Sequence, residues 1–206
     1  MPFPDRTLAL VPTTTWPTLA RTTRAFDADI FVQGLDRDLG QAWDIMTRFC
    51  ALANISANSN NKLPKEVLLD TMGSVMYRLL HLRFKSGTTD EVTRLGLLSF
   101  SASVFLMVRH GAFSMPCYPS AFRDCLLNLA QPTIFPYQVL LWLLVAGSTA
   151  GFPQGDDVHL KSSMRTIATT HHVVSWDEMK EILKSVMWID IIHDGAARVL
   201  FDSISS

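Results

Sequence analysis

The sequence has few cysteines and few charged residues for its length, and each shortage excludes a class of protein. Its 206 residues include three cysteines, Cys50, Cys117 and Cys125, with no Cys-x-x-Cys pair. We therefore expect no disulfide framework and no four-cysteine zinc site. The same shortage of cysteines favours a reducing intracellular compartment. Charged residues make up 18% of the chain, below the roughly 25% of an average soluble domain. With 48% hydrophobic residues, the composition predicts a large core or a surface that a partner covers.

Clusters of basic residues are also missing. The 18 lysines and arginines are balanced by 19 acidic residues, and they gather in no run along the chain. A protein that holds nucleic acid needs cations concentrated on one face to neutralise phosphates. We therefore expect no direct nucleic-acid binding.

Targeting and cofactor motifs are absent as well. The start, MPFPDRTLALVP, lacks the basic region and long apolar run of a secretory signal. The most apolar helical segment, between Pro136 and Gly151, is shorter than the roughly 20 residues that span a bilayer. The phosphate-binding and dinucleotide-binding glycine motifs and the His-Glu-x-x-His zinc motif do not occur. We expect no membrane span, no cofactor and no metal.

The apolar residues that are present recur at helical spacing. Steps of three and four residues mark the helices expected at about 38–55, 64–87, 88–110, 119–130, 136–150, 156–171 and 175–187, with a last helix to 204. No segment alternates as a strand would. The sequence predicts an all-α protein: a single bundle of about seven helices over residues 34–206, preceded by an extended arm rich in proline and threonine over residues 1–33.

Local signals predict where several helices begin and end. Thr88 with Glu91, and Ser175 with Glu178, have the spacing of a capping box, in which each side chain pairs with the other residue's backbone N–H. Asp194 is expected to cap the last helix. The polar segment NISANSNN, residues 54–61, is expected to be a loop.

Polar side chains at the ends of apolar helices are the candidate functional residues. His81 and Arg83 follow one such helix, and Arg109 and His110 close the next. Such side chains either reach solvent or line a cavity between helices, where bundles usually build their sites. Tyr118 and His193 complete the candidate set, although adjacent residues such as His193 and Asp194 rarely point at each other.

Four ordered segments resemble a known family. WDEMKEILKSVMWIDIIHDGAARVLFD at 176–202 is similar to the C-terminal signature of fungal-specific transcription factors of the zinc-binuclear-cluster class. LHLRF at 80–84, RLGLLSFSASVFL at 94–106 and LLWLLVAGSTAG at 140–151 are similar to earlier blocks of that family's helical regulatory region. The resemblance covers about residues 65–204.

This resemblance implies a regulatory role, with one departure. In such proteins the helical region follows a six-cysteine zinc cluster that binds DNA, and it handles ligand response or partner contact. The Cys-x2-Cys-x6-Cys pattern does not occur in this sequence. Zinc binding and DNA recognition are therefore not carried over.

Two functions remain open from the sequence. One is a transcription-factor-like regulatory protein without its own DNA-binding domain, linked to fungal secondary metabolism and located in the nucleus. Its partner would be a hydrophobic small molecule, another protein or a second copy of the chain. The other is a cofactor-independent cytoplasmic enzyme, a cyclase, pericyclase or dehydratase, that positions a hydrophobic natural-product intermediate in a dry cavity between helices.

Overall fold

The computed structural model describes residues 25–59, 64–109, 118–129, 135–149 and 158–205, and these ranges contain helices and connecting turns but no strand. The predicted all-α class is confirmed. The helices of these ranges are α1 (Ala25–Gln33), α2 (Arg37–Asn58), α3 (Lys65–His81), α4 (Thr89–Arg109), α5 (Tyr118–Leu127), α6 (Tyr137–Thr149), α7 (Val158–Thr170), α8 (Trp176–Val186) and α9 (Asp190–Ser205).

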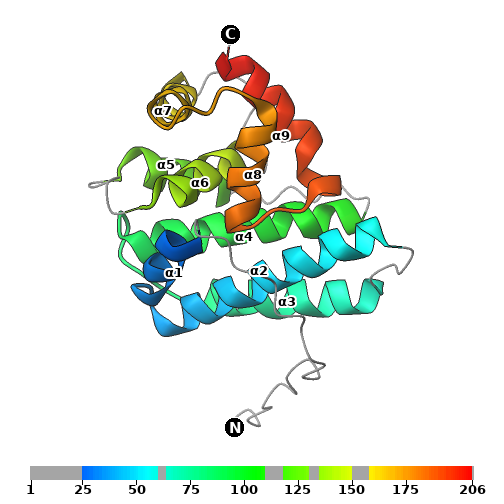
Figure 1. Ribbon diagram of the computed structural model, residues 1–206. Coiled ribbons are helices and arrows are strands. Elements are labelled where there is room, and N and C mark those ends of the chain that lie inside the picture. Colours follow the sequence, from blue (N-terminus) through cyan, green and yellow to red (C-terminus); the bar gives the residue numbers. More distant parts are fainter. Residues whose placement is uncertain (1–24, 60–63, 110–117, 130–134, 150–157, 206) are drawn as a thin grey trace, which may run out of the picture.

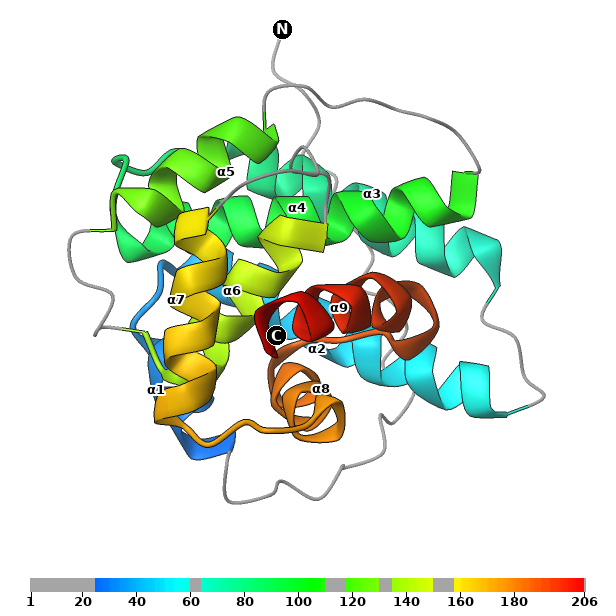
Figure 2. The ribbon, with the colours of Figure 1, turned by 90° about the horizontal axis from the view of Figure 1, so that it is seen from above.

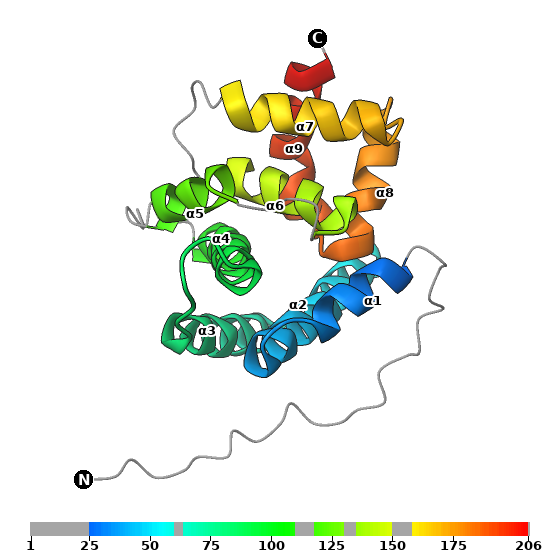
Figure 3. The same ribbon diagram turned by 90° about the vertical axis from the view of Figure 1, so that its left-hand side faces the viewer.

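The helices stack in layers around α4. Figures 1 and 3 show α2 and α3 on one side of α4, and α7 and α9 on the opposite side of the molecule, with α5 and α6 between. Helix α4 contacts α2, α3, α5 and α6, while α6 contacts α7, α8 and α9. Helix α4 and the strongly apolar α6 therefore lie in the middle, as expected for helices that are apolar on nearly every face.

The centre of the bundle depends on a glycine. A Cβ built on Gly96 of α4 would lie 2.4 Å from Leu143 Cδ2 of α6 and 3.5 Å from Trp142. Leu143 and Trp142 are both fully buried. The missing side chain at residue 96 therefore allows α4 and α6 to approach closely.

Helix α1 corrects the predicted N-terminal arm. Residues 25–33 are helical, although the sequence predicted an extended arm through residue 33. Phe31 packs its ring against Trp43, with centroids 5.8 Å apart, and against Phe135, with centroids 5.3 Å apart. These distant contacts stabilise a segment whose own apolar period is too short to indicate a helix. Residues 1–24 lie outside the described residues.

Two predicted helix ends are also wrong. Helix α2 continues to Asn58 through most of the segment predicted as a loop. Helix α3 ends at His81, six positions before Gly87, where the sequence placed its end. Arg83 and Arg94 donate to carbonyls of its last turn, in place of the backbone N–H groups that a longer helix would supply.

No helix in the described ranges combines the length and the apolar character that crossing a membrane requires.

Candidate functional site

The turn between α8 and α9 lies at the centre of a network of hydrogen bonds and ion pairs. Met187, Trp188 and Ile189 form this turn, and all three are buried. Trp142 of α6 donates its indole N–H to the carbonyl of Met187 at 2.6 Å. Helix α8 is fixed at its other end by a complete Ser175–Glu178 capping box, as the sequence predicted. Figure 2 shows α8 and α9 side by side, joined by this turn.

Asn54 of α2 holds the same turn at two points. Its amide nitrogen donates to the carbonyl of Trp188 at 2.8 Å, and its amide oxygen accepts the backbone N–H of Asp190 at 3.0 Å. Asp190 is the first residue of α9. Because the first N–H groups of a helix have no partner within it, Asn54 acts as a cap supplied from another helix.

This long-range cap corrects the prediction for Asp194. Helix α9 begins four residues before Asp194, which therefore lies inside the helix and does not cap it. Its carboxylate instead accepts the indole N–H of Trp188 at 2.9 Å and the ammonium of Lys180 at 2.6 Å. Lys180 also lies 3.1 Å from Asp190. Its hydrogen bond to Asp194 is the main reason why its pKa is raised above 10.5.

His193 lies beneath this turn, in the interior. Its ring stacks on Phe100 of α4, with centroids 4.6 Å apart, and its other neighbour, Trp188, has its centroid 4.8 Å away. Nε2 lies 3.0 Å from the hydroxyl of Ser103, and Nδ1 lies 3.0 Å from the carbonyl and 3.4 Å from the N–H of Ile189. Either neutral tautomer therefore has a partner at both nitrogens.

The environment of His193 keeps the ring neutral. Burial lowers its pKa from 6.5 to about 4, against smaller opposing effects of the Ile189 hydrogen bond and the charge of Asp194. A general base needs one ring nitrogen directed at the substrate. Both nitrogens of His193 are directed at protein atoms, so the residue is placed to support the turn.

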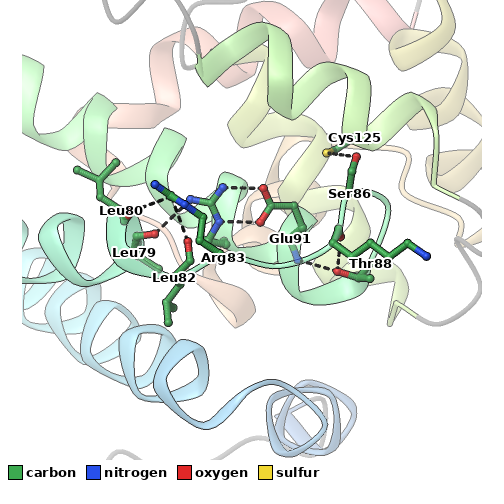
Figure 4. A network of polar contacts seen from close by, with 10 residues as sticks. Leu79, Leu80, Leu82, Arg83, Ser86, Thr88, Glu91 and Cys125 are labelled. Carbon is green, nitrogen blue, oxygen red and sulfur yellow. Dashed lines mark hydrogen bonds and ion pairs between the residues drawn. The ribbon is translucent and has the colours of Figure 1, made fainter.

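His81 and Arg83 lie on the surface, at the end of α3. Nδ1 of His81 lies 2.7 Å from the carbonyl of Tyr77, whose ring it contacts with centroids 4.1 Å apart. Arg83 donates to the carbonyls of Leu80 at 2.9 Å and Leu82 at 3.3 Å (Figure 4). Because the last carbonyls of a helix have no partner within it, Arg83 serves as a C-terminal cap.

Arg94 is a buried charge that was not among the predicted candidates. Its guanidinium pairs with both carboxylate oxygens of Glu91, at 2.7 and 2.6 Å, and donates to the carbonyl of Leu79 at 3.2 Å. The predicted Thr88–Glu91 capping box is therefore only half formed. Thr88 accepts the N–H of Glu91 (Figure 4), but the carboxylate of Glu91 is engaged by Arg94. The signal available in the sequence was the three-residue spacing of Glu91 and Arg94.

The remaining candidates are Arg109, His110 and Tyr118, and the structure does not describe their side chains. Arg109 ends α4 and Tyr118 begins α5, but the side chains of both lie outside the described part of the chain. His110 lies wholly outside it. Among the candidates with described side chains, His81 and Arg83 are exposed and His193 is buried. Within the described residues, no group of three histidine, cysteine or acidic side chains could hold a metal ion.

The outward face of α9 is the other feature of this region. Its inward residues, His193, Ala197, Phe201 and Ile204, are buried in the bundle. On the opposite side Ile191 is 74% exposed and Val199 is 71% exposed, with exposed Gly195 midway between them. We call these three residues the α9 outer face.

Comparisons with known proteins give this chain no relative. No family model, no curated protein and no solved structure matches it.

Proposed function

We propose that the chain is a transcription-factor-like regulatory domain of fungal secondary metabolism that works through a protein partner and does not itself recognise DNA. The resemblance of residues 65–204 to the regulatory region of fungal transcription factors motivates this class. The near balance of 18 basic and 19 acidic residues fits a domain that does not grip phosphates.

The α9 outer face is the observation that carries the proposal. Helix α9 is fixed from within by α2, α6, α7 and α8, so its outer residues are presented on a rigid support. Exposed apolar side chains that form a contiguous patch mark contact surfaces, and Ile191 and Val199 lie on one line of α9. A partner that covers a side chain such as Ile191 lowers the free energy of the complex, because apolar surface is removed from water.

The positions of the candidate polar residues support the same class. His81 and Arg83 satisfy backbone carbonyls at the end of α3, and His193 is enclosed beneath the α8–α9 turn. These three side chains have structural partners at separate places. A regulatory domain needs no converging acid and base.

Transcript profiling tests the proposal. A strain that lacks the gene should lose a defined set of pathway transcripts, and the wild-type gene should restore them. A gene with Ile191→Asp and Val199→Asp should restore them poorly, whereas a control with Ser162→Asp and Thr169→Asp on the exposed side of α7 should restore them fully. Unchanged transcripts in the deletion strain would refute the proposal.

The alternative that the sequence left open is a cofactor-independent enzyme. Such an enzyme should convert a hydrophobic pathway intermediate faster than the spontaneous rate. Wild-type protein that leaves every intermediate at its spontaneous rate would exclude this function.

A further inference from the structure

The α9 outer face has the pattern of a surface that fits a copy of itself. Ile191, Gly195 and Val199 are four residues apart, so they form one line along the helix. The two ends of the line, Ile191 and Val199, have large side chains, and Gly195 in the middle has none. The space above Gly195 is open, because a Cβ built there would meet no atom within 4 Å. In Figure 1, α9 lies along the upper edge of the molecule.

A two-fold axis through Gly195 would match this line with itself. An interface between identical subunits related by a two-fold axis must be self-complementary. If one residue contacts a second residue of the other copy, the second residue of the first copy contacts the first residue of the other. With two α9 helices antiparallel and crossing at Gly195, Ile191 of each copy faces Val199 of the other. The glycine at the crossing point lets the two backbones come close without a side chain between them.

Charges beside the line have the order that this arrangement requires. Asp194 and Arg198 are four residues apart, so they lie on one flank of the line, about 40° apart around the helix. A two-fold axis reverses their order, which places Arg198 of each copy beside Asp194 of the other. Both carboxylate oxygens of Asp194 have partners in their own chain, Trp188 at 2.9 Å and Lys180 at 2.6 Å, so Arg198 of the other copy would join an existing ion pair.

We propose that the chain forms a homodimer through antiparallel pairing of the α9 outer face. This deepens the proposed function and rests on it for its biological role, because it names a second copy as the partner of that face. A contact built on one helix from each copy falls below about 1,200 Å² of buried surface, the range of weak and transient complexes. The dimer is therefore concentration-dependent.

Sedimentation velocity over a range of protein concentrations tests the pairing. The weight-average mass should rise from 23.0 kDa toward twice that value as the concentration increases. Ile191→Asp places two aspartates in the symmetric interface and should hold the protein at the monomer mass. Arg198→Asp should weaken the dimer at least tenfold, because Asp194 would then face an acid. Val158→Asp is the matched control, since Val158 is 68% exposed on α7, and it should leave the dimer unchanged.

A cysteine cross-link tests the position of the axis. Cys50 and Cys125 are buried, so in a Cys117→Ser background the variant Gly195→Cys should form a disulfide between two copies under mild oxidation. Val158→Cys should cross-link at the low rate of random collisions. A wild-type protein that remains monomeric, or a dimer that ignores Ile191→Asp and cross-links equally at both positions, would overturn the inference.

The outcomes separate this inference from the proposed function. A monomeric protein whose Ile191 and Val199 variants still alter transcripts would reject the dimer and retain the regulatory role. A dimer in a chain whose deletion alters no transcript would do the reverse.

Discussion

Gly96 and Gly73 both lie within helices, but we expect alanine to have opposite effects on stability at the two positions. A Cβ at Gly96 would lie 2.4 Å from Leu143, whereas one at Gly73 would meet nothing within 4 Å. Gly96→Ala should therefore lower the free energy of unfolding by about 1–3 kcal/mol through overpacking. Gly73→Ala should raise it by up to about 1 kcal/mol, because alanine favours a helix. Denaturant unfolding measures both, and equal effects would show that α4 and α6 are not closely packed.

The buried imidazole of His193 makes stability depend on pH. Its pKa falls from 6.5 in the unfolded chain to about 4 in the fold, so between these values the unfolded state binds a proton that the folded state does not. Stability should therefore fall as the pH is lowered from about 6.5 to 4. The contribution of this one group should reach about 3 kcal/mol.

A variant isolates the contribution of His193. His193→Gln should flatten the curve of unfolding free energy against pH over this window, while His159→Gln, at an exposed position on α7, should leave the slope as in the wild type. Parallel curves for the wild type and His193→Gln would mean that the ring is solvated in the fold.

At this scale the sequence indicated some residues correctly. Ser175 and Glu178 form the predicted capping box because both partners lie within one turn of helix. Glu91 does not complete its own box, because Arg94 offers its carboxylate a bidentate ion pair. A local pattern cannot decide between two partners that are both within reach.

One side chain of another helix, Asn54, holds the α8–α9 turn at two points. Asn54→Ala should lower the free energy of unfolding by about 2–4 kcal/mol, because the carbonyl of Trp188 and the N–H of Asp190 would lose their partners. Asn54→Asp keeps the acceptor for Asp190 but sets a carboxylate oxygen against the carbonyl of Trp188, so it should also lower stability. Asn58→Ala, at the exposed end of α2, should change stability by less than about 0.5 kcal/mol. Chemical denaturation of the three variants gives the ranking, and equal values for residues 54 and 58 would reject the role of Asn54.

The start of α9 could not be predicted from neighbouring residues. Local reasoning placed the cap at Asp194, because an aspartate before an apolar period is a common helix start. The actual cap comes from Asn54, which the sequence assigned to a loop. The two residues joined by that hydrogen bond are 136 positions apart, so no window of local sequence contains both.

The whole molecule should unfold as one unit. Buried residues of all helices from α1 to α9 belong to a single hydrophobic cluster, which includes Trp43, Trp142 and Trp188. Helix content followed by far-UV circular dichroism and tryptophan fluorescence should therefore give coincident transitions in denaturant. Asn54→Ala should shift both transitions equally. Two separated midpoints would show that the α8–α9 hairpin unfolds independently of the rest.

The fold class could be predicted at this scale, but the arrangement of the helices could not. Apolar spacing of three and four residues is a local property, and it identified α2 and the helices after it. Which faces meet depends on contacts such as that between Trp43 and Trp142, whose centroids are 5.5 Å apart. Of the candidate residues at helix ends, His81 and Arg83 have described side chains, and each lies against a backbone carbonyl of the last turn of α3.

The position of Asn54 also bears on how the chain folds during synthesis. Its two backbone partners follow it by 134 and 136 residues. Met187, the partner of Trp142, follows that tryptophan by 45 residues. Until the ribosome has released the turn at 187–189, the earlier helices expose an unpaired amide, an unpaired indole and the apolar surface that the turn later covers. Such an incomplete chain is prone to aggregation. A pause in translation before this turn would prolong that state.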